Sequence, residues 1–585
     1  MSRVDRLLLN DPGQCVDEML QSISMQNPGQ RLLKGHRVVI REDVENFRKK
    51  GLVSLVCGGG SGHEPFAAGF VGEGMLTAAV AGSIFASPPP NDILAAIKAV
   101  ASPAGVLLIV ANYTGDRLNF GIALERALAL KLKVKMVVVG EDCALESQDK
   151  TAGKRGLVGI VAVMKIAGAL SEMGKSLDYV VQVATRAASA MGTIGVSLGG
   201  CSVPGSGSSF VLDPTEMELG LGVHGEAGIK RLKILSADDT IVAMINHMTN
   251  PQNASHIRLQ EGDQISLIFN NLGGLSVLEM HVLARKAILF LKEKLLTVVR
   301  VYFGHLMTSL DMSGFNLNIL KLDEEILICL DASTNAPNWP TLCKSQVTGY
   351  DINSISLYLA AKEDADFDSE QKEQVDAACD PTINAVLKAI TNACQALIAN
   401  EVQLNELDTL AGDGDCGSTI KRGATDILDK CETWKALSID KILLNIASSA
   451  EETMGGASGG LYSLFFTAAA GLAKDLNMAT ICDCLQAGVN AVSKYGGAEP
   501  GDRTMLDALT AAHSSLQNQI KKKSSPKEVA KVVSKACCDA AESTANMKAR
   551  AGRASYVASN LLAKPYAVAV AVSIWIEAFS KSLAV

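Results

Sequence analysis

Several signatures of other protein classes are missing from this chain of 585 residues. It has no dense run of lysine or arginine and its formal net charge is −8, so it lacks the basic surface that nucleic-acid binding requires. Its fourteen cysteines include no CxxC pair, which argues against a zinc site and favours reduced thiols in the cytoplasm. The most apolar late stretch, 567–576, is too short to span a bilayer, so we expect no membrane partner.

Strand-like runs are confined to the first part of the sequence. Four short β-branched runs predict buried strands, at 52–57, 106–111, 134–140 and 265–270. Helical patterns such as 157–173 and 276–294 lie between them. Because continuous apolar strands alternate with helices, residues 1–361 predict an α/β domain whose parallel or mixed sheets are covered on both faces. Ligands of such folds gather at the loops beyond the strand ends.

The second part has a different pattern. An acidic segment, 362–381, predicts an exposed linker. Beyond it, residues 382–585 are rich in Ala and Leu at helical spacing and predict an all-α domain. The expected helices are 382–399, 418–429, 440–451, 459–473, 478–494, 504–521, 527–544 and 567–583. Seven of the eight histidines precede residue 310, so imidazole chemistry is expected in the first domain.

Two loops that directly follow predicted strands carry polar residues suited to chemistry. The loop CGGGSGHEP, 57–65, has glycines that let the backbone approach a ligand closely, and it places His63 beside Glu64. A tight turn between a strand and a helix is its structural alternative. The loop NYTGDRLNF, 112–120, contains Asp116, which is either a base or the cap of the following helix.

A third loop, ELGLGVHGEAG at 218–228, places His224 between Gly222 and Gly225. A histidine on an apolar helix face is usually part of the core, but this one lies in a glycine-rich loop. Neutral imidazole is a nucleophile, and the glycines leave room for a small carbonyl compound to reach it.

The helical part contains a candidate metal loop, LDTLAGDGDCG at 407–417. Asp408, Asp413 and Asp415 form the pattern D-x4-D-x-D, and three crowded carboxylates repel one another unless a hard cation neutralises them. The spacing does not fit an EF-hand, and Mg²⁺ carried with nucleotide phosphates fits better. A solvated acidic turn is the alternative.

A glycine-rich loop, MGGASGG at 454–460, opens one of the predicted helices. Backbone amides at a helix N-terminus bind phosphate oxygens. The polar loops PGDRTMLD, 500–507, and AGRASY, 551–556, could close the same site.

In combination these loops resemble one family. GGGSGHEP, NYTGDRLNFG, GxHGEAG, the D-x4-D-G-D pattern, GGASG, PGDRTM and AGRASY occur in this order in the dihydroxyacetone kinase family, and the resemblance covers residues 20–580. It implies an ATP-dependent kinase that phosphorylates dihydroxyacetone or glyceraldehyde, with an eight-helix barrel as its nucleotide domain. It also implies a homodimer.

The resemblance further implies roles for residues of the first domain. His224 would bond covalently to the substrate carbonyl carbon as a hemiaminal, and Asp116 would be the base for the substrate hydroxyl, assisted by His63. The implied substrate pocket consists of Gly60, Ser61, Gly62, His63, Ser87, Ala111 and Asp116.

For the second domain, the resemblance implies that Asp408, Asp413 and Asp415 hold Mg²⁺ ions that bridge the ATP phosphates. The implied nucleotide contacts are Asp413, Gly414, Asp415, Cys416, Ala457, Ser458, Gly496, Thr504 and Met505.

Two positions depart from the family pattern. Ala111 stands where the family commonly has a lysine that touches the substrate, so we expect Ala111→Lys to tighten substrate binding. Residues 564–567 replace a DPGA turn that lines the nucleotide, so nucleotide affinity is expected to differ.

Two further functions compete with the kinase. The same metal site could cleave FAD to AMP and riboflavin cyclic phosphate, with Mn²⁺ or Co²⁺. We expect this FAD-AMP lyase reaction as a side activity of the kinase, and the alternative is that it is the main activity. A regulator that senses carbonyl compounds without catalysis is disfavoured, because all three aspartates are present.

Overall fold

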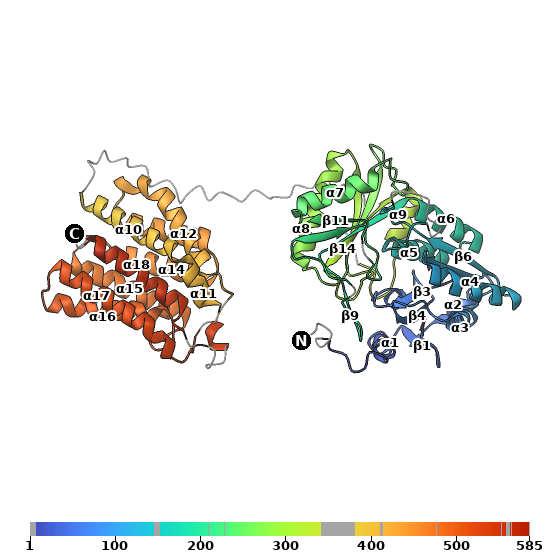
Figure 1. Ribbon diagram of the computed structural model, residues 1–585, viewed down its shortest axis with the longest axis horizontal. Helices are drawn as coiled ribbons and strands as arrows, with labels where there is room; N and C mark the ends of the chain where they lie inside the picture. Colours follow the sequence, from blue (N-terminus) through green and yellow to red (C-terminus); the bar gives the residue numbers. More distant parts are fainter. Residues whose placement is uncertain are drawn as a thin grey trace. The chain divides into compact units, whose positions relative to one another are not determined.

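The computed structural model describes residues 7–583 except 146–152, 209, 227, 341–380, 410–412, 476, 552, 557–561 and 563. The chain divides into two compact units, Met1–Ala360 and Ala361–Val585 (Figure 1). The strands of the described chain all belong to the first unit, and the second is helical. The acidic segment predicted as a linker lies outside the described residues, except for Pro381.

The first sheet of the α/β unit has six strands and mixed topology. In spatial order they are β1 (Gln30–Leu32), β2 (Val38–Arg41), β4 (Ala78–Ile84), β3 (Ser54–Ser61), β5 (Val106–Ala111) and β6 (Val134–Val139). β3 pairs in parallel with both β4 and β5, and β5 with β6, whereas β2 is antiparallel to β1 and β4. The carboxyl ends of β3 and β5 therefore lie at the same edge.

Helices on both faces of this sheet explain the continuous apolar run of β5. They are α3 (Pro90–Val100), α4 (Thr114–Ala129), α5 (Gly159–Glu172) and α6 (Leu177–Ser189). All six residues of β5 are buried. Leu107 packs in the core that contains α5 and α6, and the next residue, Leu108, packs in the core that contains α3 and α4. Successive side chains of a strand point to opposite faces, so both faces must be apolar.

The second sheet of this unit also has six strands. In spatial order they are β11 (Lys230–Lys233), β10 (Glu216–Leu219), β7 (Met191–Ser197), β14 (Gly314–Lys321), β12 (Gln264–Asn271) and β13 (Thr297–Gly304). α7 (Ala237–Thr249) and α8 (Val277–Glu293) share one apolar core with it. The remaining elements are α1 (Cys15–Gln26), α2 (Val44–Lys49), η2 (Ala68–Phe70), β8 (Ser202–Val203), β9 (Gly207–Ser208) and α9 (Glu324–Asp331).

The predicted elements of this unit are confirmed. The four predicted strands are β3, β5, β6 and β12, and the two predicted helices are α5 and α8. The α/β fold class follows from these elements and their pairing.

The helical unit is a closed ring, as the resemblance to the family implied. The eight predicted helices are α10 (Pro381–Ala399), α12 (Cys416–Cys431), α13 (Ile439–Ser449), α14 (Gly456–Ala470), α15 (Met478–Gly496), α16 (Met505–Lys521), α17 (Pro526–Ser543) and α18 (Ala567–Leu583). Each packs on the next along the chain, and α18 packs back on α10. None of the described helices is long and apolar enough to cross a membrane.

One α-helix of this unit was not predicted. α11 (Glu401–Asp408) has eight residues and buries only Leu404, so its sequence contains no apolar stripe. The short helical turn η5 (Glu432–Ala436) also falls outside the predicted segments, and η6 (Ala450–Met454) begins within the predicted helix 440–451 and extends beyond it.

We expect Leu107→Ala to lower the free energy of unfolding by about 2–5 kcal/mol, because the leucine is fully buried between two helical layers. Urea unfolding of the full chain measures the change. Leu118→Ala on α4 is the control, since Leu118 is 60% exposed and its truncation should change stability by no more than about 0.5 kcal/mol. Equal effects of the two substitutions would contradict the assignment of Leu107 to the core.

Candidate functional site

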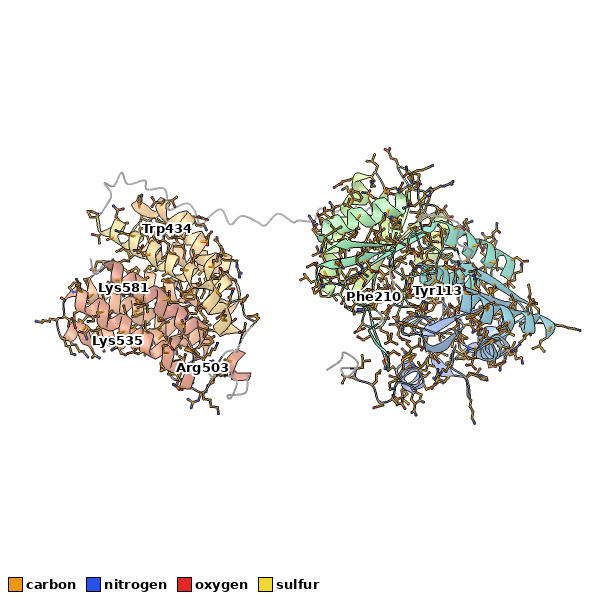
Figure 2. The ribbon with its side chains drawn as sticks, viewed as in Figure 1. Tyr113, Phe210, Trp434, Arg503, Lys535 and Lys581 are labelled. Carbon is orange, nitrogen blue, oxygen red and sulfur yellow. The ribbon has the colours of Figure 1, made fainter. Side chains whose placement is uncertain are left out.

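The candidate site of the α/β unit is built where loops from both sheets converge. The loop after β3 carries His63, the loop after β5 carries Tyr113 and leads into α4, and the loop after β10 carries His224. The centroid of the His224 ring lies 4.7 Å from that of His63, 4.5 Å from that of Tyr113 and 5.6 Å from that of Phe85. Figure 2 labels Tyr113 within this unit. Two histidines far apart in the sequence therefore share one site.

His63 is buried and held in one tautomer. Its Nδ1 lies 2.8 Å from the carbonyl oxygen of Thr308, and because a carbonyl only accepts, Nδ1 carries the proton. Its Nε2 is then an acceptor, buried and without a hydrogen-bond partner among the described residues. Burial, with a smaller contribution from the neighbouring His224, lowers the pKa of His63 to about 3. The ring is therefore neutral at pH 7.

His224 is also neutral and is fixed through its backbone. Its N–H donates to Oε2 of Glu226 at 2.9 Å. Burial, and after it the positive charge of Arg155, lowers the pKa of His224 to about 4. At pH 7 its imidazole is the free base, which is the nucleophilic form.

Asp116 lies in the first turn of α4, but it is not the cap. The N-cap of α4 is Tyr113, three residues before Asp116, so the interpretation of Asp116 as the cap is wrong. Burial raises the pKa of Asp116 to about 6, against a hydrogen bond from Ser87 that lowers it. Its Oδ1 is buried and has no hydrogen-bond partner in the described chain. A carboxylate with such a pKa is ionised at pH 7 and basic enough to take a proton.

Glycine is required at two positions of the loop 57–65, where the loop packs against Phe85 and Ala86. A Cβ on Gly60 would lie 2.7 Å from the backbone nitrogen of Ala86. Gly62 has a φ of +99°, and its Cβ would lie 2.9 Å from the ring of Phe85. The hydroxyl of Ser61 already makes a hydrogen bond within the protein, because it donates to the carbonyl of Gly82 at 2.8 Å. The GGGSG sequence thus positions His63 and Phe85.

Ala111, the predicted substrate contact that departs from the family pattern, lies in a buried position. It is the last residue of β5, only 3% exposed, and its methyl group belongs to the hydrophobic core. A lysine side chain would start inside that core, where burying an ammonium group opposes any gain from a substrate contact. The predicted substrate contact of Ala111 and the expected benefit of Ala111→Lys stay predictions, and the burial of this position weighs against both.

A segment without any motif joins the two histidine loops. The Thr308 N–H donates to the carbonyl of His63 at 3.1 Å, and the Leu310 N–H donates to that of Gly62 at 2.8 Å. The hydroxyl of Ser309 donates to the carbonyl of Val223 at 2.7 Å. Sequence reasoning missed this segment because backbone carbonyls and amides, which every residue has, make most of these bonds.

The acidic loop of the helical unit gathers its three carboxylates. One oxygen from each of Asp408, Asp413 and Asp415 lies within 4.8 Å of the others. Gly414, with a φ of +79°, makes the turn. The N–H groups of Gly414 and Asp415 donate to Oδ2 of Asp408 at 3.0 and 3.2 Å. Asp408 and Asp415 have no lysine or arginine partner among the described residues, so this set of hard oxygen donors fits Mg²⁺.

The glycine-rich loop presents the start of α14. Its N-cap is Gly455, which has a φ of +66° and no capping side chain. No atom lies within 4 Å of where a Cβ on Gly455 or Gly456 would be. Ala457 is exposed and Ser458 is half-buried. Because no side chain caps them, the first amides of α14 are available to phosphate oxygens.

Arg422 connects the glycine-rich loop with the acidic loop. Its guanidinium donates to the carbonyls of Thr453 and Met454 at 3.2 and 3.1 Å, and to the hydroxyl of Thr419 at 3.0 Å. That hydroxyl donates to Oδ2 of Asp415 at 3.4 Å. The two loops therefore belong to one end of the helical unit.

The other predicted nucleotide contacts differ in what they can offer. Cys416 and Met505 are 5% and 3% exposed and share one core, so only their backbones can reach a ligand. Thr504 caps α16, and its side chain accepts from the N–H of Leu506. Gly496 is the last residue of α15.

The divergent turn at 564–567 is attached to the PGDRTMLD loop. The buried guanidinium of Arg503, labelled in Figure 2, donates to the carbonyls of Lys564 and Thr544 at 2.8 and 3.1 Å. The turn at 564–567 is therefore hydrogen-bonded to Arg503, the residue before Thr504.

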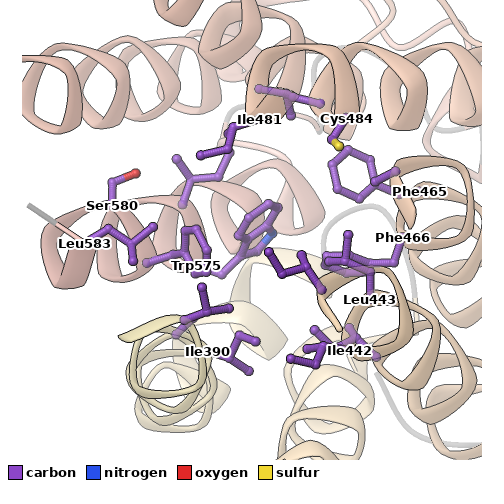
Figure 3. A pocket seen from close by; sticks show the side chains of 18 of the residues that line it. Ile390, Ile442, Leu443, Phe465, Phe466, Ile481, Cys484, Trp575, Ser580 and Leu583 are labelled. Atoms are coloured by element: carbon purple, nitrogen blue, oxygen red, sulfur yellow. The ribbon is translucent and has the colours of Figure 1, made fainter. Parts of the chain in front are cut away.

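The interior of the helical ring contains a cavity of about 540 Å³ (Figure 3). Its walls are apolar side chains from all eight helices of the ring, among them Ile442, Phe465 and Trp575. Ile420 and Met454, behind the acidic and glycine-rich loops, also line it. Hydrocarbon walls offer no donors to phosphate oxygens, so the cavity is distinct from the candidate nucleotide site.

Comparison with known proteins identifies the family of both units. The Dak1 domain matches residues 21–338, and the DAK2 domain matches residues 410–581. Triokinase/FMN cyclase of Homo sapiens is 42% identical over 583 residues, which cover 98% of this chain and 99% of the human protein. The chain belongs to the dihydroxyacetone kinase family.

Solved structures of this family show the same fold. The dihydroxyacetone kinase of C. freundii in its native form is 32% identical, with a TM-score of 0.65 and full coverage of both chains. Its complex with AMP-PNP and Mg²⁺ matches with a TM-score of 0.63. This dihydroxyacetone kinase family member is therefore an enzyme, and its reaction class is that of a kinase.

For this kinase we expect Asp413→Ala and Asp415→Ala to weaken Mn²⁺ binding by more than the roughly 10–100-fold that loss of an outer-sphere partner causes. Each removes one of three converging carboxylates. Electron paramagnetic resonance of Mn²⁺ measures the affinity. Asp429→Ala is the control, since it removes an exposed carboxylate from α12, the helix that follows the acidic loop. Unchanged affinity in either test variant would contradict the metal assignment.

Proposed function

We propose that this chain transfers the γ-phosphoryl group of ATP to dihydroxyacetone and D-glyceraldehyde, with the substrate held covalently on His224. The observation that supports this most is the contact between two buried, neutral imidazoles, His63 and His224. The names of the human and C. freundii relatives fit a triose acceptor.

The anchoring step is an addition in which no atom is lost. A ring nitrogen of His224 donates its lone pair to the carbonyl carbon, and the π electrons move to the carbonyl oxygen, which takes up a proton. The other ring nitrogen gives up its proton, so the neutral hemiaminal contains every atom of imidazole and substrate. Glycerol has no carbonyl and is not held. A covalent tether suits a substrate with too few atoms for tight noncovalent binding.

The two buried acceptors without partners match the hydroxyls of a triose. Oδ1 of Asp116 would take the proton of the attacking hydroxyl, and Nε2 of His63 would accept a hydrogen bond from a second hydroxyl. The proposed pocket consists of Gly60, Ser61, Gly62, His63, Ser87, Asp116 and His224.

In the helical unit, Asp408, Asp413 and Asp415 would hold Mg²⁺, which supplies charge neutralisation for the phosphates when bound. The free amides at the start of α14 would bind phosphate oxygens. The proposed nucleotide contacts are Asp413, Gly414, Asp415, the backbones of Cys416 and Met505, and Ala457, Ser458, Gly496 and Thr504.

A second activity, cleavage of FAD to AMP and riboflavin cyclic phosphate, would use the same helical site with Mn²⁺ or Co²⁺. The attacking hydroxyl belongs to FAD itself, so this reaction needs metal and phosphate positioning but no acceptor pocket. The acidic and glycine-rich loops, joined through Arg422, meet that need within the helical unit. The name FMN cyclase of the human relative fits this proposal.

We expect His224→Ala to lower kinase turnover with dihydroxyacetone by about three orders of magnitude or more, because the tether supplies proximity as well as selectivity. FAD cleavage should stay within about twofold, since that reaction offers no carbonyl at its reacting centre. Steady-state kinetics of both reactions on one preparation make the comparison, with His281→Ala, an exposed histidine of α8, as control.

Near-normal kinase turnover in His224→Ala would refute the covalent anchor. Equal loss of both activities in a folded variant would refute the independence of the two reactions.

We also expect kinase kcat/KM to fall as pH drops through about 6, because protonation of Asp116 removes the base. His63 and His224, with pKa values of about 3 and 4, do not titrate in that range. Ser87→Ala removes the hydrogen bond that lowers the pKa of Asp116, so it should move the acid limb to higher pH. A limb in the same place in Ser87→Ala would contradict the role of Asp116.

A further inference from the structure

Arg155, between β6 and α5, contacts three acceptors in the neighbourhood of His224. Its Nε lies 2.6 Å from Oδ2 of Asp142, and its Nη1 lies 3.3 Å from Oε1 of Glu226. Its Nη2 donates to the carbonyl of Gly220 at 2.7 Å. Every nitrogen of the guanidinium is therefore occupied, which fixes its orientation.

The Glu226 carboxylate transmits this orientation to His224. One oxygen accepts from Arg155, and the other accepts the backbone N–H of His224 at 2.9 Å. The loop is folded closely around this pair, because a Cβ on Gly222 would lie 1.7 Å from Oε1 of Glu226 and 2.9 Å from Nη1 of Arg155. Any other residue at 222 would displace the ion pair.

Asp142 ties the same guanidinium to the first sheet. Its side chain has no exposed surface, and its second carboxylate oxygen accepts the N–H of Ala144 at 2.8 Å. The N–H of Asp142 also donates to the carbonyl of Arg155 at 3.1 Å. The His224 loop, which follows a strand of the second sheet, is thereby anchored to the end of β6 in the first.

The charged and titratable groups around His224 come from several elements of the α/β unit. His63 comes from the loop after β3, Tyr113 from the start of α4, Glu226 from the loop of His224 itself, and Arg155 from the segment before α5. The buried carboxyls Glu141 and Asp142 lie behind them. Among these groups Arg155 is the permanent cation, and its charge disfavours a second positive charge on His224.

We propose that Arg155 is a positioning residue that aligns the His224 loop through Glu226, and that its charge adds to burial in keeping the imidazole neutral and nucleophilic. The inference rests on the proposed role of His224 as the substrate anchor. It assigns to Arg155 no contact with the substrate.

The test compares Arg155→Gln with the parent chain in two measurements. Nuclear magnetic resonance of the imidazole nitrogens should show the pKa of His224 rising above about 4, while burial, the larger cause, still holds it below the ordinary value near 6.5. The KM for dihydroxyacetone should rise about ten- to a hundredfold, the loss expected for hydrogen bonds to a charged group. FAD cleavage should be unchanged. Arg186→Gln is the matched control, since Arg186, on α6, also pairs with two carboxylates, those of Asp323 and Glu325.

Arg155→Lys separates charge from orientation. It keeps the cation but cannot reach three acceptors at once, so the pKa of His224 should stay low while KM still rises. If Arg155→Gln does not fold, Glu226→Gln replaces it, because an amide oxygen still accepts the N–H of His224 while the ion pair is lost; its KM should rise as well.

Folded Arg155→Gln with the parent's His224 pKa and KM would overturn the proposal, and so would folded Glu226→Gln with the parent's KM. Both outcomes are distinct from failure of the proposed function. That failure is kinase activity that survives His224→Ala, whatever the Arg155 variants do.

Discussion

Parallel pairing of β3 with β5 determines where the chemistry of the α/β unit can occur. Because the two strands are neighbours and run the same way, the loops GGGSGH and NYTGD leave the sheet at one edge. His63 and Tyr113 then need only short loops to reach the same place, and Asp116 follows Tyr113 in the first turn of α4. The second sheet brings His224 to that edge, and the segment 308–310 joins the two histidine loops by hydrogen bonds.

Withdrawal from water has opposite effects on the two kinds of titratable group gathered there. It lowers the pKa of both imidazoles, which keeps them neutral, and it raises the pKa of Asp116. One physical cause thus gives the proposed nucleophile, acceptor and base the protonation properties that their roles require. The helical unit uses the reverse strategy, since its acidic loop keeps charged oxygens near the surface for a cation.

Periodicity predicted most of the fold because the signals are strong. β5 is apolar on both faces, and the eight ring helices each contain a long helical pattern, whereas α11 contains too few apolar residues to show one. Motifs located His63, His224 and the three aspartates, because glycine-rich loops with chemical side chains are rare. They did not reveal Thr308 or Arg155, which act through backbone carbonyls or ion pairs to residues distant in the sequence. The family pattern also did not reveal that Ala111 is buried in this chain.

Closure of the helical ring by α18 against α10 has a consequence for the order of synthesis. α18 follows the other seven helices of the ring in the sequence, so the ring stays open until α18 has been synthesised. Until then the apolar walls of the cavity, including Trp575 on α18 itself, lack their final neighbours. The α/β unit is complete much earlier and can fold while the rest is being made. A chain cut short before residue 567 would therefore keep an intact first unit joined to an unclosed, aggregation-prone ring.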